Sequence, residues 1–260
     1  MESGYLIVPN FFAPKCNKYI EGADPERIHA ISYNYCNFNC EYCNFSKRQI
    51  DATYHNWSDS EAFSQKVDSL LQTGHHFKFT GGEPTLNPYL KRDLQIVRDK
   101  GGIIYLDTNC SIADIIEDLL SKNLVDVLGI SLKGLSKLEA QKKSRVSNAT
   151  LCWDNVWKVI GVASSAKAEV IVTYVVNQDF SFTTLEEFSS LLEPYSKVYM
   201  KINNYQVDNR IIENGWKPFN DEQLEKIVFQ FVQRNPVWRG RVILIPNSQS
   251  ITNFSKVRLL

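Results

Sequence analysis

Three cysteines lie close together in the segment YNYCNFNCEYCNFS, residues 33–46. Three residues separate Cys36 from Cys40 and two separate Cys40 from Cys43, so half of the six cysteines lie within eight residues. Three thiolates can bind three irons of a cubane iron–sulfur cluster and leave the fourth iron free. A structural zinc site would need a fourth ligand, which His55 could supply, and a reduced trio without a metal is the third interpretation.

Two glycines follow an apolar segment in FTGGEPTLNP, residues 79–88. Gly81 and Gly82 lack a Cβ, so the backbone there can approach a ligand closely and can adopt a positive φ. Thr80 and Glu83 flank the pair with a hydroxyl and a carboxylate. The stretch is compatible with an ordinary turn and with a turn that binds a ligand.

Polar residues follow two further apolar segments. YLDTNCS (105–111) contains Asp107, Asn109 and Cys110, and VDVLGISLKG (125–134) contains Ser131 and Lys133. Asn109 could cap the next helix, and Cys110 could be a small buried side chain. Lys133 could be solvated or could pair with the carboxylate of a ligand.

Short apolar segments alternate with longer amphipathic ones along the chain. The apolar segments predict strands at 27–34, 76–80, 103–107, 125–132, 168–176 and 197–203. Helices are predicted between them, the first two with Ser58 and Asn87 as N-caps. This order predicts an α/β fold, a partial (β/α)6 TIM-like barrel of parallel strands with outer helices, and an open doubly wound sheet is the alternative. In either fold, the residues described above lie at the carboxyl ends of the strands.

The spacing CxxxCxxC, with the aromatic Tyr42 before the last cysteine, resembles the motif of the radical S-adenosylmethionine (SAM) enzymes. The GGEP turn resembles the GGE motif of that family, which holds the methionine ammonium of SAM. The resemblance implies that Cys36, Cys40 and Cys43 hold a [4Fe-4S] cluster. It also implies that SAM chelates the fourth iron, which would explain why a fourth cysteine is missing.

Other segments resemble the glycyl-radical-enzyme activating enzymes within that family. LDTNC (106–110) is similar to their LDTNG segment, SLKG (131–134) to their DLK segment, and VIVTYVVNQDF (170–180) to the strand that packs beside adenine. At the end of the sixth strand Asn203, Asn204 and Tyr205 are alternatives for a polar contact. The resemblance therefore implies SAM-binding roles for Tyr42, Thr80, Gly81, Gly82, Glu83, Asp107, Asn109, Ser131, Lys133, Val175, Asn177 and Asn203.

Two positions depart from the activating-enzyme pattern. Cys110 replaces the glycine of LDTNG, and its thiol could donate a hydrogen atom to a radical or could fill the core. Ser131 replaces the aspartate of DLK, which in the family helps to form a monovalent-cation site. The resemblance therefore does not extend to that site.

The resemblance implies reductive cleavage of SAM to a 5′-deoxyadenosyl radical, which abstracts a hydrogen atom from a protein glycine. The alternatives are radical epimerisation, cross-linking or rearrangement of a small peptide or metabolite, and a non-catalytic iron–sulfur or zinc module. The implied partners are an electron donor such as flavodoxin or ferredoxin and a protein or peptide substrate.

Composition and length bound the remaining expectations. The formal net charge of zero predicts no nucleic-acid partner. No apolar run reaches about 18 residues, which predicts no membrane span, and the N-terminus has no signal-peptide pattern, which predicts a cytoplasmic protein. The resemblance covers residues 30–205 as the core barrel, with 1–29 as an N-terminal extension and 206–260 as a C-terminal extension packed on the same domain.

Overall fold

The structure of the protein is a computed structural model that describes residues 4–11, 28–43, 55–56, 59–206, 215–245 and 258–259, with only the backbone described for 4–11, 55–56 and 258–259. The strands are β1 (Gly4–Phe11), β2 (Ile28–Tyr33), β3 (His55–Asn56), β4 (His76–Gly81), β5 (Ile103–Thr108), β6 (Val127–Leu132), β7 (Glu169–Val176), β8 (Val198–Asn204), β9 (Val242–Ile245) and β10 (Arg258–Leu259). The α-helices are α2 (Ser60–Leu71), α3 (Leu90–Asp99), α4 (Ala113–Ser121), α5 (Lys137–Ser144), α6 (Asn155–Ser165), α7 (Phe182–Leu192) and α8 (Asp221–Arg234). The short helical turns are η3 (Pro84–Leu86), η4 (Thr150–Asp154) and η5 (Pro236–Trp238).

All the described strands form one sheet in the order β10-β9-β8-β7-β6-β5-β4-β2-β1-β3. The seven strands from β2 to β9, omitting β3, are parallel to their neighbours in that series. The strands β1 and β10 pair antiparallel with β2 and β9. The parallel register brings the carboxyl ends of the seven strands to one edge of the sheet, where a site on this architecture is expected.

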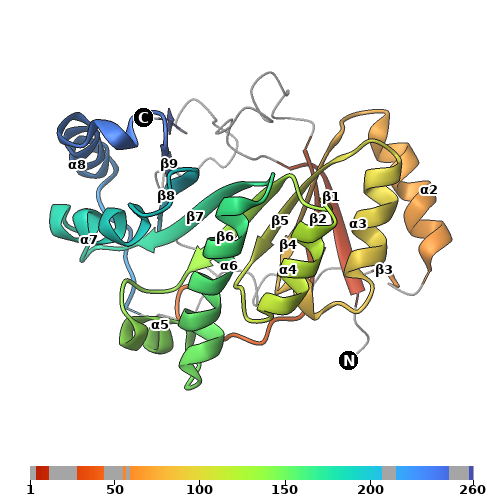
Figure 1. Cartoon of the computed structure of the whole chain (residues 1–260), viewed down its shortest axis with the longest axis horizontal. Helices are drawn as coiled ribbons and strands as arrows, with labels where there is room; N and C mark the ends of the chain where they lie inside the picture. Colours follow the sequence, from red (N-terminus) through yellow and green to blue (C-terminus); the bar gives the residue numbers. More distant parts are fainter. Residues whose placement is uncertain are drawn as a thin grey trace.

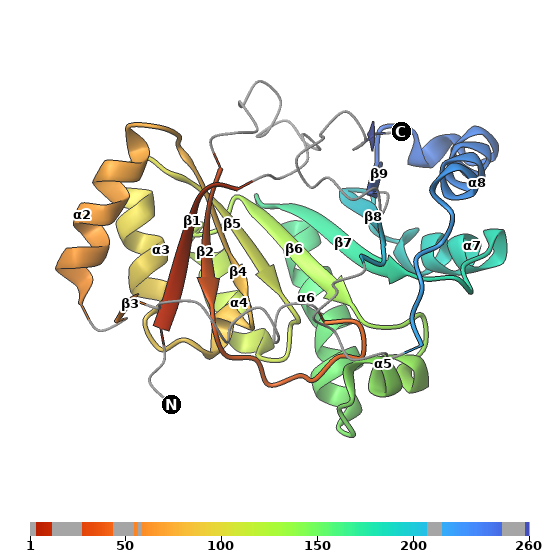
Figure 2. The ribbon, with the colours of Figure 1, turned by 180° about the vertical axis from the view of Figure 1, so that it is seen from behind.

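The helices cover one face of the curved sheet and leave the strands open to view from the other side (Figures 1 and 2). A large apolar core joins the two layers, because alternate strand residues such as Leu106, Ile130 and Val172 pack with helix residues such as Leu94 and Ile116. In the described part of the chain, every helix is too short or too polar to span a lipid bilayer.

The predicted fold class is confirmed, since the sheet is parallel and its helices lie outside a partial barrel. Each of the six predicted strands is present with its ends shifted by at most two residues. The sheet also contains β9, a seventh parallel strand from the segment that was predicted to be an extension. Its four residues, VILI, are too few for the apolar pattern to be distinctive. The domain boundaries themselves stay a prediction.

Both predicted N-caps differ from the observed ones. The helix α2 begins after Asp59, whose side chain accepts a hydrogen bond from the Ala62 amide, and Ser58 lies outside the described residues. The prediction of Asn87 as the cap of α3 was wrong, because the cap position is Tyr89. The Asn87 side chain instead accepts from the Tyr89 amide at 2.9 Å, which closes a turn one step before the helix.

Candidate functional site

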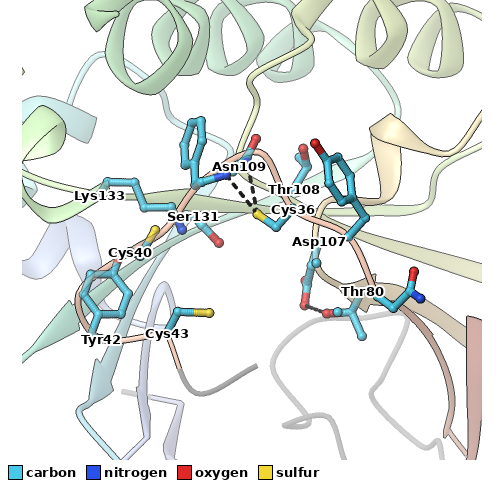
Figure 3. A pocket seen from close by; sticks show the side chains of 15 residues that line it. Cys36, Cys40, Tyr42, Cys43, Thr80, Asp107, Thr108, Asn109, Ser131 and Lys133 are labelled. Atoms are coloured by element: carbon cyan, nitrogen blue, oxygen red, sulfur yellow. Dashed lines mark hydrogen bonds between the residues drawn. The ribbon is translucent and has the colours of Figure 1, made fainter. Parts of the chain in front are cut away.

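A cavity of about 310 Å³ opens at the carboxyl ends of β2, β4, β5 and β6. It combines a loop that follows β2 with residues from the ends of the other three strands. Figure 3 shows the cysteines on one side of the cavity and the pair Thr80 and Asp107 on the other. The lining residues are Asn34, Tyr35, Cys36, Phe38, Cys40, Tyr42, Cys43, Thr80, Gly81, Gly82, Asp107, Thr108, Asn109, Ser131 and Lys133.

The cysteine loop, residues 34–43, is fixed on the C-terminal end of α5. The amides of Asn39 and Glu41 donate to the carbonyls of Ser144 and Lys143 at 3.2 and 2.9 Å. The Phe38 ring is buried against Ala140 of the same helix. These contacts hold the loop in place without using any of its three thiols.

The three thiols of the loop are half-buried and face the cavity (Figure 3). Burial raises the pKa of the Cys36 thiol to about 11 and also raises the pKa of Cys40. Both thiols are therefore protonated at neutral pH until a metal displaces the proton. The side-chain amide of Asn109 donates to the Cys36 sulfur at 3.8 Å, and this contact orients the sulfur.

Three thiols can hold either a zinc ion or a cubane cluster. Tetrahedral zinc with Zn–S bonds of about 2.3 Å would draw its thiolates to within about 3.8 Å of one another. A cubane binds each thiolate through a different iron, so its ligands need not converge. The side chain of His55, the alternative zinc ligand, lies outside the described residues.

The glycine turn after β4 packs directly on the cysteine loop. The amides of Gly82 and Glu83 donate to the carbonyls of Tyr33 and Tyr35 at 2.8 and 2.7 Å. Gly81 has a φ of +105°, and a Cβ on Gly82 would lie 1.9 Å from the Tyr35 carbonyl oxygen. Both positions therefore need glycine, the first for its backbone conformation and the second for the close approach.

Glu83 lies behind the cavity wall and is not one of its lining residues. The side chain is 1% exposed. One carboxylate oxygen accepts from the Thr108 hydroxyl at 2.7 Å and from the Thr85 hydroxyl at 2.6 Å. The other accepts from the backbone N–H of Asn109 at 2.6 Å. Burial raises the pKa of this carboxyl, and the hydrogen bonds oppose the rise. Glu83 thus joins the turn after β4 to the turn after β5.

Asp107 forms the far wall of the cavity. Its carboxylate accepts from the Thr80 hydroxyl at 3.1 Å and pairs with the Lys78 ammonium at 2.8 Å. A Cβ on Gly129 would lie 2.2 Å from Asp107 Oδ1, so this glycine of β6 makes room for the carboxylate. Ser131 follows Gly129 on the same face of β6. Asp107, Thr80 and Ser131 were predicted site residues, whereas Lys78, which lies in the middle of β4, was not.

Lys133 lies just beyond the end of β6, with its ammonium 5.8 Å from the centre of the Tyr42 ring. Burial lowers the pKa of this lysine, whereas the negative charge that Tyr42 and the three cysteines carry when they are ionised raises it, and the net change is a rise. The side chain is therefore cationic at neutral pH. Figure 3 shows it reaching into the cavity beside Cys40, where it can pair with an anionic ligand.

Four other predicted site residues do not line the cavity. Cys110 is wholly buried in the main core, and its φ of +63° is a backbone conformation that favours glycine. Val175 and Asn203 face each other across β7 and β8 at the same edge of the sheet, beyond the cavity wall. Asn177 donates to Asp179 in the following turn. Their roles at the site stay predictions.

Trp216 is a residue of the site that the sequence did not reveal. Its ring lies 5.0 Å from the Tyr42 ring and 5.7 Å from the Tyr205 ring, and its indole N–H donates to Glu41 at 3.4 Å. Trp216 follows Glu41 by 175 residues in the sequence, although the two side chains are in contact. The only signal in the sequence was an aromatic residue in an irregular segment before α8. These contacts hold the cysteine loop through Tyr42 and Glu41.

We expect Trp216→Ala to loosen the cysteine loop. Loss of the aromatic contacts costs about 0.5–1.5 kcal/mol for each ring pair beyond the buried area, so a bound cluster should lose iron several-fold faster to a chelator. The measurement is the decay of cluster absorbance under anaerobic conditions. Trp216→Phe should restore most of the retention, and Trp238→Ala, which removes a buried tryptophan at η5, should not change it. Equal decay in Trp216→Ala and the wild type would contradict this role.

Sequence comparison relates the chain to known proteins. A profile of the radical SAM superfamily matches residues 30–192, more than half of the chain. Two proteins of Methanocaldococcus jannaschii named as glycyl-radical enzyme activating enzymes, MJ1227 and MJ1632, are 27% and 29% identical over 111 and 113 residues. Each match covers 42% of this chain, and 45% and 40% of the two relatives, so less than half the length of either is represented.

Solved structures share the fold at low sequence identity. Streptococcus suis SuiB bound to S-adenosylmethionine matches with a TM-score of 0.62 and 13% identity, over 84% of this chain and 46% of that one. SuiB bound to its precursor peptide SuiA matches with a TM-score of 0.59 and 14% identity, over 78% of this chain and 45% of that one. Identities this low support the fold alone.

Proposed function

Because the chain belongs to the radical SAM superfamily, we propose that it reductively cleaves SAM at a [4Fe-4S] cluster and then removes a hydrogen atom from a bound substrate. Members of this superfamily use both cofactors. The observation that supports the proposal is that one cavity is lined by the three cysteines, by Gly81 and Gly82, and by Lys133.

In this proposal Cys36, Cys40 and Cys43 each hold one iron. A reduced cluster held by these residues would supply one electron to the SAM sulfonium, and its bond to C5′ would then break to give methionine and a 5′-deoxyadenosyl radical. The chain positions SAM, since the exposed backbone of the glycine turn can bind its ammonium and Lys133 can bind its carboxylate. The walls of the cavity shield the radical from water.

The substrate that we favour is a glycine of a partner protein. Support comes from the two relatives named as activating enzymes and from the LDTN and SLKG segments. The alternative is epimerisation, cross-linking or rearrangement of a small peptide or metabolite, and SuiB, which shares the fold, is a protein that binds a precursor peptide. A non-catalytic iron–sulfur or zinc module would not need Lys133 or a glycine turn beside the thiols.

Lys133→Ala is expected to weaken SAM binding about 10- to 100-fold, because a hydrogen-bonded charge pair contributes roughly 1.5–3 kcal/mol. The measurement is a SAM titration of the cluster-loaded protein. Lys100→Ala, which removes a lysine from the opposite end of the sheet, is the control and should bind SAM like the wild type. Lys133→Arg should recover part of the affinity. A dissociation constant within two-fold of the wild type for Lys133→Ala would exclude the carboxylate role.

The central experiment is anaerobic. The cluster is rebuilt in the purified protein, SAM and dithionite are added, and 5′-deoxyadenosine is measured by mass spectrometry. The proposal expects this product only when the cluster, SAM and reductant are all present. If a loaded cluster that binds SAM yields no product with or without candidate substrates, the proposed function is wrong.

A second experiment separates the two substrate classes. The activated protein is mixed with a glycyl-radical enzyme encoded beside its gene, and the mixture is examined by electron paramagnetic resonance. A protein-based glycyl radical supports the activating function. A short precursor peptide encoded in the same place, changed in mass or stereochemistry after incubation, supports the alternative.

A further inference from the structure

The exposed face of α5, from Leu138 in its first turn to Arg145 at its C-terminal end, is not used by the proposed reaction. Leu138 is the most exposed large hydrophobic residue in the described part of the chain, at 77%. Lys142 follows it by one helical turn and Arg145 ends the helix, and both are exposed. We call Leu138, Lys142 and Arg145 the α5 surface.

The α5 surface has a net positive charge. The nearby carboxylates Glu139 and Asp154 are already paired, with Lys143 at 2.5 Å and with Lys137 at 2.8 Å. Within the described part of the chain, neither Lys142 nor Arg145 has an acidic partner. Cations at a helix C-terminus are favoured by the helix dipole alone, but the dipole does not account for an exposed leucine beside them. A single exposed leucine is common on protein surfaces, so the feature that points to a partner is the positive charge of Lys142 and Arg145, which would attract an acidic protein.

Arg145 has a backbone conformation that favours glycine, which suggests that the arginine is present for its side chain. Its φ of +56° places it in the left-handed region, where glycine is the usual residue at the end of a helix. An arginine there costs about 1 kcal/mol relative to glycine. The strained position therefore carries a charged side chain that the fold itself does not require.

The same end of α5 is the support of the cysteine loop. The Glu41 amide donates to the Lys143 carbonyl at 2.9 Å, and Glu41 is bonded directly to Cys40. One hydrogen bond and a short run of covalent bonds therefore lead from the Cys40 thiol to the exposed residues. This is the kind of short bonded route along which an electron can pass from the surface to the cavity.

We propose that the α5 surface docks the protein that delivers electrons to the cluster, a one-electron carrier with acidic side chains around its redox group. The proposal rests on the proposed function and names its partner. Flavodoxin hydroquinone would give up one electron and become the semiquinone, while the cluster goes from the 2+ to the 1+ state. No other bond forms or breaks. Positive charge at the docking site would speed the encounter.

The test measures electron delivery in the cluster-loaded protein by stopped flow, with flavodoxin hydroquinone as the probe and dithionite in parallel. Lys142→Glu combined with Arg145→Glu should lower the second-order rate with flavodoxin at low salt at least ten-fold and should weaken its salt dependence. The rate with dithionite should not change. Direct binding of oxidised flavodoxin, measured by calorimetry, should weaken in the same variant. Lys197→Glu with Arg239→Glu makes the same charge change at the opposite end of the sheet and should behave like the wild type.

A second variant shows whether a slower reaction is caused by misfolding or by the lost charge. Arg145→Gly removes one charge and relieves the left-handed backbone, so a several-fold slower reaction with flavodoxin would reflect docking alone. An unchanged flavodoxin rate in both variants would overturn the proposal. So would an equal loss with flavodoxin and dithionite. If the variants lose only the reaction with a protein substrate when dithionite is the reductant, the α5 surface binds that substrate and not the electron donor. Absence of SAM cleavage by the wild type with dithionite would instead refute the proposed function.

Discussion

Replacement of Cys36, Cys40 or Cys43 by Ala, one at a time, is expected to abolish cluster assembly and SAM cleavage. Each thiol faces the cavity, and among the cysteines that the structure describes no other one lines it. In the proposed site each thiolate holds a different iron, so no remaining ligand can compensate for a lost one. Cleavage should fall by at least a thousand-fold. The measurements are iron and sulfide content, cluster absorbance and the yield of 5′-deoxyadenosine.

The matched control for this prediction is Cys110→Ala. This thiol is buried in the main core, and burial raises its pKa well above the usual range. The variant should assemble the cluster and cleave SAM without substrate as the wild type does. If a single variant among the three loop cysteines still cleaves SAM at the wild-type rate, the assignment of that cysteine as a ligand is wrong. A changed product from Cys110→Ala in the presence of substrate would support its role as a hydrogen donor.

Glu83→Ala is expected to lose SAM binding through loss of structure rather than loss of a contact. The carboxylate joins two turns of the cavity by bonds to Thr85, Thr108 and Asn109. Removing it leaves those donors buried without an acceptor, and the loss is partly offset because a buried charge also disappears. The free energy of unfolding should fall by roughly 2–4 kcal/mol, and SAM affinity should fall at least ten-fold. Both are measured, by denaturant titration and by SAM titration.

Asp126→Ala is the control that separates a general loss of stability from a loss of SAM affinity. Asp126 accepts from Arg98 at 2.8 Å and from the Ile104 amide at 2.7 Å, at the opposite end of the same strands. Its loss should lower stability by a similar amount and leave SAM affinity unchanged. If Glu83→Ala is destabilised like Asp126→Ala but binds SAM normally, Glu83 does not shape the cavity.

Much of the fold could be predicted because its signals are local. The six parallel strands β2 and β4 to β8 are short, apolar and separated by amphipathic segments, so their order and direction follow from periodicity. β9 was missed because four apolar residues do not distinguish a strand from any other buried segment. The caps of α2 and α3 were misplaced because several adjacent residues could each fill the position, and the turn before α3 decided between them.

The three thiols, the glycine turn and Lys133 could be recognised as candidate site residues from the sequence alone, because each belongs to a short segment at the end of a predicted strand. A parallel sheet must bring such ends to one edge. Only the tertiary structure decided how the rest of the site is built. In the folded chain, Glu83 lies behind the cavity wall and Lys78 pairs with Asp107. Trp216 packs on Tyr42, and the cysteine loop is hydrogen-bonded to α5. These contacts join residues far apart in the chain or on different strands, and side-chain packing and hydrogen bonding across such distances leave no periodic pattern in the sequence.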